Sequence, residues 1–355
     1  MKNFVMMILM ISLTFMVINC GNKTQETKEL KQPQDSMSDN NSPELLPNMN
    51  HEVLNDVRFH LAYNFEEGKE FRYRLTTLST TERDVETDSL TIDRFEQKIT
   101  RVLNFKVLSL ENNNMADIEC TISKVYVDVN LNNQKVAYQS GVTKNPEQLK
   151  RFIEHEGLVN TPFLIRITKY GEILDISNVD AISDRYLELS GLKDSIRIED
   201  KPVMENEIKN NLLKPLIGQV LREFPKKELG VESKWEKEID PASIMIFKIQ
   251  YTDHFTVEKI EKIGDKRIAS ITGDATSIIE GDRAYTTNGV NYEFADPLTE
   301  ATSNIYFDID RGLVYKGTTK TDLKLFYRME IPVDDGTKIA KTNELITNTN
   351  IVELL

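Results

Sequence analysis

The stretch ADIECTISKVYVDV, residues 116–129, decides the fold class of this chain. Apolar and polar side chains alternate along it with a period of two, which is typical of a β-strand with one buried and one wet face. The apolar positions are even-numbered at first and odd-numbered afterwards: Ile118, Cys120 and Ile122, then Val125, Val127 and Val129. This change of phase predicts a β-bulge or a strong bend near Ser123-Lys124.

Stretches with the same alternation lie on both sides of this one. They are VRFHLAY (57–63), FRYRL (71–75) and ITRVLNFKV (99–107) before it, and IMIFKIQY (244–251), FTVEKI (255–260), KRIASI (266–271), SNIYFDIDRGLVYKG (303–317) and LKLFYRMEI (323–331) after it. The Glu67-Gly68 pair suits a turn between the first two. We therefore expect an α+β fold that is mostly antiparallel β, built as a curved sheet or as half-barrel halves.

Helical patterns lie between these two groups of strands. They occupy residues 145–157, 178–191 and 202–225, and a hairpin turning at Tyr170-Gly171 separates the first two. Gly157 and Gly191 suit helix ends, because glycine readily adopts the backbone conformation found there. Pro215 lies inside the longest pattern and predicts a kink or two short helices, because proline cannot donate the helical hydrogen bond.

The two β-rich parts resemble each other in their order of elements. NFKVLSLENNNMADIECTI (104–122) matches HFTVEKIEKIGDKRIASIT (254–272), and the hairpin that turns at Gly171 matches the one that turns at Gly312. This similarity favours a weak internal duplication with halves 57–177 and 242–333 and a helical insert at 178–224. The alternative is that any two antiparallel hairpins look alike.

The first twenty residues are typical of a bacterial lipoprotein signal peptide. Lys2 precedes an uncharged apolar stretch, Phe4–Ile18, which is shorter than the roughly 20 residues of a membrane-spanning helix. The stretch ends in VINC, residues 17–20, which resembles a lipobox whose cysteine receives lipid. We expect residues 1–19 to be removed and Cys20 to carry acyl chains such as palmitate, because two or more chains anchor a protein stably. The alternative is a buried cysteine in a membrane helix.

Residues 20–50 are predicted to form a lipidated tether, followed by a β-rich globular region at 51–355. Residues 21–50 contain no aromatic residue and are rich in Asn, Gln, Ser and charges, so they cannot bury enough surface to fold. As a random coil such a segment reaches roughly 30 Å. Gly21 replaces the aspartate that retains some lipoproteins at the inner membrane. We therefore expect the protein in the bacterial cell envelope, at the outer membrane.

The charge and the cysteine content limit the partners. The net charge is −13, which disfavours nucleic acid as a partner because like charges repel. The chain has two cysteines. If Cys20 carries lipid, Cys120 has no disulfide partner, and its place between Ile118 and Ile122 predicts a buried, inert thiol.

Candidate catalytic and metal-binding residues are few. His51, His60, His155 and His254 are not spaced as metal ligands, and we expect them on the surface. Asp308 and Asp310 in DIDRG are similar to the start of a calcium loop, but the distal ligands are missing. We interpret them as solvated carboxylates beside a turn. No nucleotide-binding loop or nucleophile motif is present, so we predict no catalytic residue, no metal ligand and no cofactor.

One aromatic residue stands apart from the strands. Trp235, with Phe224 and Pro225 before it, either lines a groove or plugs the end of the core, and we favour the plug.

Three motifs together resemble a known family. EEGKEFRYRL (66–75), KYGEILDISN (169–178) and FPKKELGVESKWEKE (224–238) are similar to a family of uncharacterised secreted bacterial lipoproteins, classed as a domain of unknown function. The likeness covers roughly Leu61 to Ile331. It implies a fold and an envelope location, but neither an activity nor functional residues. A curved antiparallel sheet that cups helices is also similar to periplasmic lipoprotein and lipid carriers, which is an analogy of fold alone.

The leading hypothesis is therefore a membrane-anchored envelope lipoprotein without enzymatic activity, which binds a partner protein or an apolar ligand in the concavity of its sheet. Two alternatives stay open. One is an envelope hydrolase with scattered carboxylates, which needs a pocket with two close acidic groups. The other is a purely structural surface lipoprotein.

Overall fold

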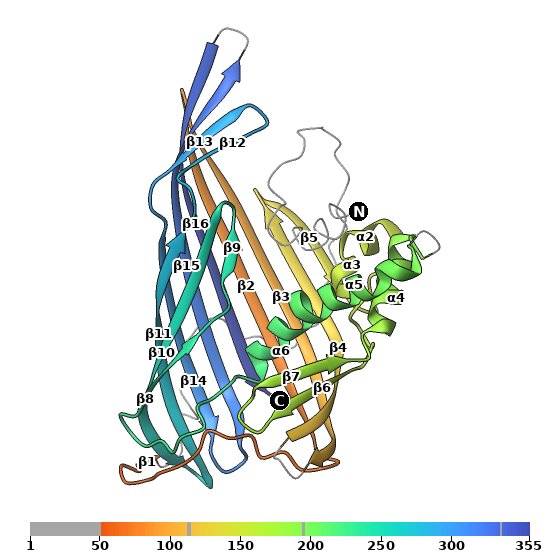
Figure 1. The fold of residues 1–355 in the computed structure, drawn as a ribbon, viewed down its shortest axis with the longest axis vertical. Helices are drawn as coiled ribbons and strands as arrows, with labels where there is room; N and C mark the ends of the chain where they lie inside the picture. Colours follow the sequence, from red (N-terminus) through yellow and green to blue (C-terminus); the bar gives the residue numbers. More distant parts are fainter. Residues whose placement is uncertain (1–50, 112–114, 194–195, 334–335) are drawn as a thin grey trace. The chain divides into compact units, whose positions relative to one another are not determined.

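The computed structural model describes residues 51–111, 115–193, 196–333 and 336–355. The predicted signal peptide, Cys20 and the predicted tether lie outside these residues. The described part confirms the expected fold class: it is mostly antiparallel β, with few helices and one large open, curled sheet (Figure 1). Among the described helices, none combines the length and apolar character that crossing a membrane requires.

Sixteen strands in the described residues form this one sheet. They are β1 (His51–Val53), β2 (Glu70–Glu86), β3 (Leu90–Glu111), β4 (Met115–Leu131), β5 (Gln134–Gln139), β6 (Phe163–Thr168), β7 (Ile173–Ser177), β8 (Lys234–Glu238), β9 (Ala242–Ile244), β10 (Phe247–Ile263), β11 (Lys266–Glu280), β12 (Ala284–Thr287), β13 (Val290–Phe294), β14 (Leu298–Asp308), β15 (Leu313–Val333) and β16 (Gly336–Leu354). The main order is β1-β10-β11-β14-β15-β16-β2-β3-β4-β6-β7. Consecutive strands are mostly neighbours, and the pairing of β16 with β2 joins the two β-rich parts.

The strand order is the same in the two proposed halves. β3, β4, β6 and β7 follow one another across the sheet as β10, β11, β14 and β15 do. An up-and-down meander produces this order without any duplication, so the duplication stays a prediction.

The predicted bulge in β4 is confirmed. Leu103 pairs with Ile122 and Val102 with Lys124, so Ser123 is the extra residue. Its hydroxyl donates to the backbone carbonyl of Val102 at 3.3 Å. The bulge returns the odd-numbered valines to the buried face after it, which explains the change of phase in the sequence.

Two expectations about strands need correction. Residues 57–63 have the expected buried face, but they form an extended segment whose ladder contact is an isolated bridge between Phe59 and Leu229. Alternation reports burial, and these residues are buried without a neighbouring strand. β16 is missing from the expected strands, because several of its inward positions carry polar residues such as Thr342 and Glu344.

The helical segments lie between β5 and β8 along the chain. They are α2 (Pro146–Arg151), α3 (Ile153–Glu156), α4 (Asp180–Ser190), η1 (Ile198–Asp200), α5 (Lys201–Glu207), η2 (Ile208–Leu213) and α6 (Lys214–Val220). Asn145 caps α2, and Gly191 ends α4 in the left-handed conformation. The predicted break near Pro215 is confirmed: the π-helical turn η2 precedes α6, whose first turn contains this proline.

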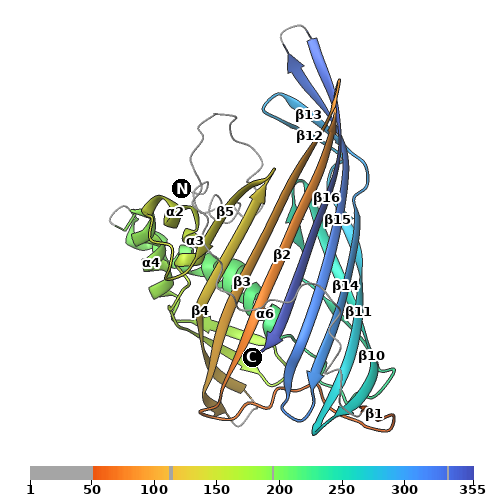
Figure 2. The same cartoon turned by 180° about the vertical axis from the view of Figure 1, so that it is seen from behind.

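The helices cover only part of the sheet. Figures 1 and 2 show that the far ends of β2, β3, β15 and β16 extend past them. A large apolar core lies under the helices, and its sheet residues include Tyr73, Leu75 and Ile305. A smaller cluster lies farther along the same strands and contains Phe247, Leu325 and their neighbours. We call the face that carries Tyr73 and Leu75 the inner face.

Candidate functional site

Along the strands, the side chains of the inner face change from apolar to polar. One row of paired residues is apolar and buried: Val257, Ile271, Ile305, Gly317, Val352 and Leu75. The next row, which we call the polar row, contains Ser303, Thr319, Asn350 and Thr77. Thr77 donates to Asn350 at 2.9 Å. The core therefore ends at a line of hydrogen-bonding side chains across the middle of the sheet.

The segment after α6 reaches this line. The Tyr63 hydroxyl donates to the Arg222 carbonyl at 3.0 Å, and the Phe224 amide donates to the Tyr170 carbonyl at 2.8 Å. Gly171 has φ +87°, and a Cβ there would lie 2.0 Å from the Arg222 carbonyl oxygen. The turn between β6 and β7 therefore requires glycine, because any side chain would push the segment away.

The Arg222 side chain is half-buried against the inner face. Its Nη2 donates to the Thr319 hydroxyl at 2.7 Å, while its Nε is buried and has no hydrogen-bond partner. Desolvation lowers the pKa of this guanidinium, although Tyr63 and Asp253 favour the charged form. A cation in such a place is stable only if other groups compensate its charge.

A cavity of about 100 Å³ adjoins this guanidinium. We call it the Arg222 cavity. Its lining residues come from α6 and the segment after it, from β8 and its end, and from β10 and β14: Gly218, Arg222, Glu223, Phe224, Trp235, Lys237, Ile239, Asp253, Phe255 and Ile305. Lys237 and Glu223 form an ion pair at 3.0 Å, and their side chains are 33% and 45% exposed. This pair therefore lies where the lining meets solvent.

Aromatic rings form much of the wall. Trp235 stacks on Phe255 with ring centroids 5.1 Å apart, and Phe224 packs edge-on against Phe307 at 5.3 Å. Gly273 makes room for this stack, because a Cβ there would lie 2.7 Å from the Phe255 ring. Trp235 is buried, as the plug interpretation requires, and it also lines the cavity. Pro225 is not among the lining residues.

Asp253 is the carboxylate that faces Arg222 across this cavity. Burial raises the pKa of Asp253, and Arg222 and Lys237 oppose this increase. Among the described residues, no carboxylate oxygen lies within 4.0 Å of the Arg222 guanidinium, and Glu223 is already paired with Lys237. The site therefore combines a buried guanidinium, a more distant carboxylate and an apolar wall.

Comparison with known families identifies the chain by its class. The model of a family of unknown function (DUF6263) matches residues 113–314, more than half of the sequence. The chain belongs to DUF6263. This confirms the resemblance to a domain of unknown function, while the lipoprotein character stays a prediction. No curated protein matches this DUF6263 member.

Solved structures resemble the DUF6263 chain only weakly. A structure described as lipid–protein interactions in lipovitellin is 11% identical, with a TM-score of 0.43, and the match covers 82% of this chain and 25% of that one. The chain thus spans about a quarter of the lipovitellin chain. An outer membrane channel of Pseudomonas putida F1 is 8% identical, with a TM-score of 0.19 and coverage of 83% and 98%. Likenesses at this level do not establish a shared fold.

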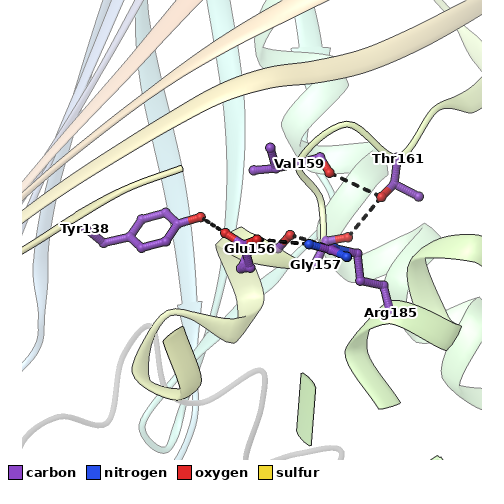
Figure 3. Close-up of polar contacts among 6 residues, drawn as sticks. All are labelled: Tyr138, Glu156, Gly157, Val159, Thr161 and Arg185. Atoms are coloured by element: carbon purple, nitrogen blue, oxygen red, sulfur yellow. Dashed lines mark hydrogen bonds and ion pairs between the residues drawn. The ribbon is translucent and has the colours of Figure 1, made fainter. Parts of the chain in front are cut away.

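A further polar cluster of this DUF6263 member consists of Tyr138, Glu156 and Arg185 and joins the helices to β5. Glu156 accepts hydrogen bonds from the Tyr138 hydroxyl and from Arg185, the latter at 2.9 Å (Figure 3). Arg185 also donates to the Glu156 backbone carbonyl at 3.3 Å. Because Tyr138 belongs to β5 and Arg185 to α4, these contacts attach the helices to the sheet.

His155 contradicts the expectation of a surface histidine. It is 4% exposed, its Nε2 lies 3.3 Å from a Glu154 carboxylate oxygen, and burial lowers its pKa to about 3. Burial raises the pKa of Glu154, which Arg101 opposes. Helical periodicity misses this burial because both faces of the short α3 are covered, one by Phe152 and Tyr138 and the other by Tyr186.

The other sequence candidates are separated. His60 is exposed, His254 contacts Glu236 and Thr276, and His51 belongs to β1. Cys120 is buried as predicted, and burial raises the pKa of its thiol. Within the part that the structure describes, no three His, Cys, Asp or Glu side chains gather as metal ligands.

The expectation of solvated carboxylates in DIDRG is half wrong. Asp310 forms a two-point contact with Arg267 at 2.6 and 2.8 Å near the surface. Asp308 is fully buried and accepts from the Arg311 amide at 3.0 Å, which closes the turn before Gly312. Gly312 packs against Asn64, and its carbonyl accepts from the Asn64 amide at 3.3 Å.

Proposed function

We propose that this chain is a lipoprotein of the bacterial envelope, anchored at the outer membrane through lipid on Cys20, and that its sheet binds an apolar ligand. The anchor rests on the lipobox-like VINC and the polar stretch after it. The ligand role rests on the Arg222 cavity.

The aromatic wall of the Arg222 cavity is the observation that carries ligand binding. Phe224, Trp235, Phe255 and Ile305 line a space of about 100 Å³, which accommodates one end of a ligand with an apolar chain. Ala275 and Ala301 on the next row of the inner face are only half-buried, and their side chains are small. The remainder of a ligand then lies over this row, toward the cluster around Phe247 and Leu325.

The hydrolase alternative lacks such an observation. Among the described residues, three carboxyl groups have a pKa raised by burial: Glu154, Asp253 and Glu344. In the described residues each of them faces an arginine, namely Arg101, Arg222 and Arg83 respectively, rather than a second carboxyl group. No described pair therefore meets the requirement for two close acidic groups.

The single tryptophan of the chain makes binding directly measurable. Trp235 lines the cavity, so we expect 1-dodecanol to change its fluorescence with a saturable dependence on concentration. Gly218 lies on α6 and lines the cavity, and nothing lies within 4 Å of its Cβ position, so we expect Gly218→Leu to extend its side chain toward the cavity. This variant should weaken dodecanol binding at least about 10-fold, and Gly218→Ala is the matched control.

Two results contradict the ligand role. One is unchanged Trp235 fluorescence with dodecanol up to its solubility limit. The other is equal binding by the Gly218→Leu, Gly218→Ala and unchanged proteins, which places the ligand elsewhere.

The anchor makes a prediction of its own at Cys20. Cys20→Ser removes the thiol that would carry lipid, so we expect the protein to leave the membrane fraction or to keep its first 19 residues. Mass spectrometry of the native protein checks this, since lipidation at Cys20 adds the mass of the acyl chains. Unchanged fractionation, and a mass that differs from the native one only by the Cys-to-Ser exchange, would refute the anchor.

A further inference from the structure

We infer that the ligand of the Arg222 cavity carries a monoanionic head group, and that the Arg222 guanidinium binds this head. The inference rests on the proposed function and narrows its ligand class. It follows from the hydrogen bonds, the charges and the rigidity of this one side chain.

The hydrogen bonds of Arg222 are incomplete. Nη2 reaches Thr319, but the buried Nε points at no acceptor in the described residues. A guanidinium presents five N–H donors in a planar fork, which matches the two oxygens of a carboxylate or a phosphodiester. In the described residues Thr319 is the one acceptor that serves this fork, and a head group in the adjoining cavity would supply the others.

The charges around the cavity favour one negative charge, and not two. Lys237 is neutralised by Glu223 at 3.0 Å, so Arg222 is the cation of the lining without an ion-pair partner among the described residues. Asp253 lines the same cavity beyond ion-pair distance and balances Arg222 only at longer range. A dianion would be repelled by Asp253, whereas a monoanion satisfies Arg222 at a smaller cost.

The guanidinium is held in place before any ligand arrives. The Arg222 carbonyl accepts from Tyr63 and lies against Gly171, and Phe224 two residues later bonds to Tyr170. Thr319 fixes the far end of the side chain. Preorganisation of this kind reduces the entropy lost on binding.

The experiment compares probes that share a chain length and differ in the head. Laurate, 1-dodecanol and dodecyltrimethylammonium are titrated against Trp235 fluorescence, the two ions below their micelle concentrations and the alcohol below its solubility limit. Dihexanoyl phosphatidylglycerol, a phosphodiester monoanion, is a further arm. We expect the unchanged protein to bind laurate or the phosphodiester at least 10-fold more tightly than dodecanol and the cation. The anion that binds more tightly distinguishes a carboxylate from a phospholipid.

Arg222→Gln should lower the affinity for the preferred anion by about 10- to 100-fold, because it removes a hydrogen bond to a charged group. It should leave the dodecanol affinity within about twofold. Arg101→Gln is the matched control, since Arg101 is also a half-buried arginine with a buried, unpartnered Nε but does not line the cavity. That variant should bind every probe as the unchanged protein does.

A variant that keeps the charge covers the case in which Arg222→Gln does not fold. Thr319→Val preserves the shape of the side chain and removes the hydroxyl that holds Nη2, so it should reduce the preference for the anion over dodecanol. Equal affinity of the unchanged protein for anion and dodecanol overturns the inference and leaves the proposed function standing. Absence of binding by every probe overturns the proposed function instead.

Discussion

Replacing Gly171 with alanine is expected to lower the free energy of unfolding by about 3 to 5 kcal/mol. Two costs add at this position. The backbone has φ +87°, which strains any residue with a Cβ, and the new Cβ would lie 2.0 Å from the Arg222 carbonyl oxygen. The neighbour is backbone, so it cannot rotate away. Urea unfolding followed by circular dichroism measures the loss.

Gly191 provides the matched control for this prediction. Its φ is +70°, and nothing lies within 4 Å of its Cβ position, so Gly191→Ala isolates the backbone strain alone. We expect it to cost about 1 kcal/mol. Gly171→Ala should also weaken ligand binding, because the shift displaces Arg222. If the two variants lose the same stability, the close approach at Gly171 has no energetic role.

Lowering the pH from 7.5 to 5.0 is expected to destabilise the protein through His155. The pKa of His155 falls from its ordinary 6.5 to about 3 in the folded state, because burial disfavours the imidazolium. Below pH 6.5 His155 therefore binds a proton in the unfolded chain but stays neutral in the folded chain. Stability is complete above pH 6.5 and decreases by about 1.4 kcal/mol per pH unit below it.

His155→Gln isolates this effect from the other groups. Glu154 acts in the opposite direction, because its raised pKa favours the folded state as the pH falls. Arg101, Glu156, Arg185 and Tyr186, which surround the pair, stay in both proteins. We expect the unchanged protein to lose about 2 kcal/mol more than His155→Gln between pH 7.5 and 5.0, from urea unfolding at both values. Parallel pH profiles would contradict a buried neutral histidine.

Much of the fold is predictable because burial leaves a periodic trace. Alternation located most long strands, the bulge at Ser123 followed from a change of phase, and the turns at Gly171 and Gly191 followed from glycine. Alternation failed in two places, because it reports which side chains are buried and not which strands pair. The segment 57–63 is buried without a ladder, and β16 pairs on both sides while part of its inner face is polar.

The candidate site is less predictable from the sequence. Trp235 and Phe224 attract notice as aromatic residues near a turn, but Arg222 and Asp253 carry no local signal. They come together only because the segment after α6 reaches Thr319 on β15 and lines the same cavity as β10, which is a matter of tertiary packing. One signal was available for Arg222: a charged residue directly after a helix with an apolar face, between Leu221 and a buried Phe224.

The pairing of β16 with β2 determines when the sheet can be completed. Thr77 and Asn350 bond to each other although 273 positions separate them, and every register pair between these strands spans a comparable distance. Most other neighbours in the sheet are hairpins, which close short loops and form quickly. The two β-rich parts can therefore form as separate meanders before they pair with each other. The contact that unites them waits for the last described strand, and until then two long strand edges remain open to wrong partners.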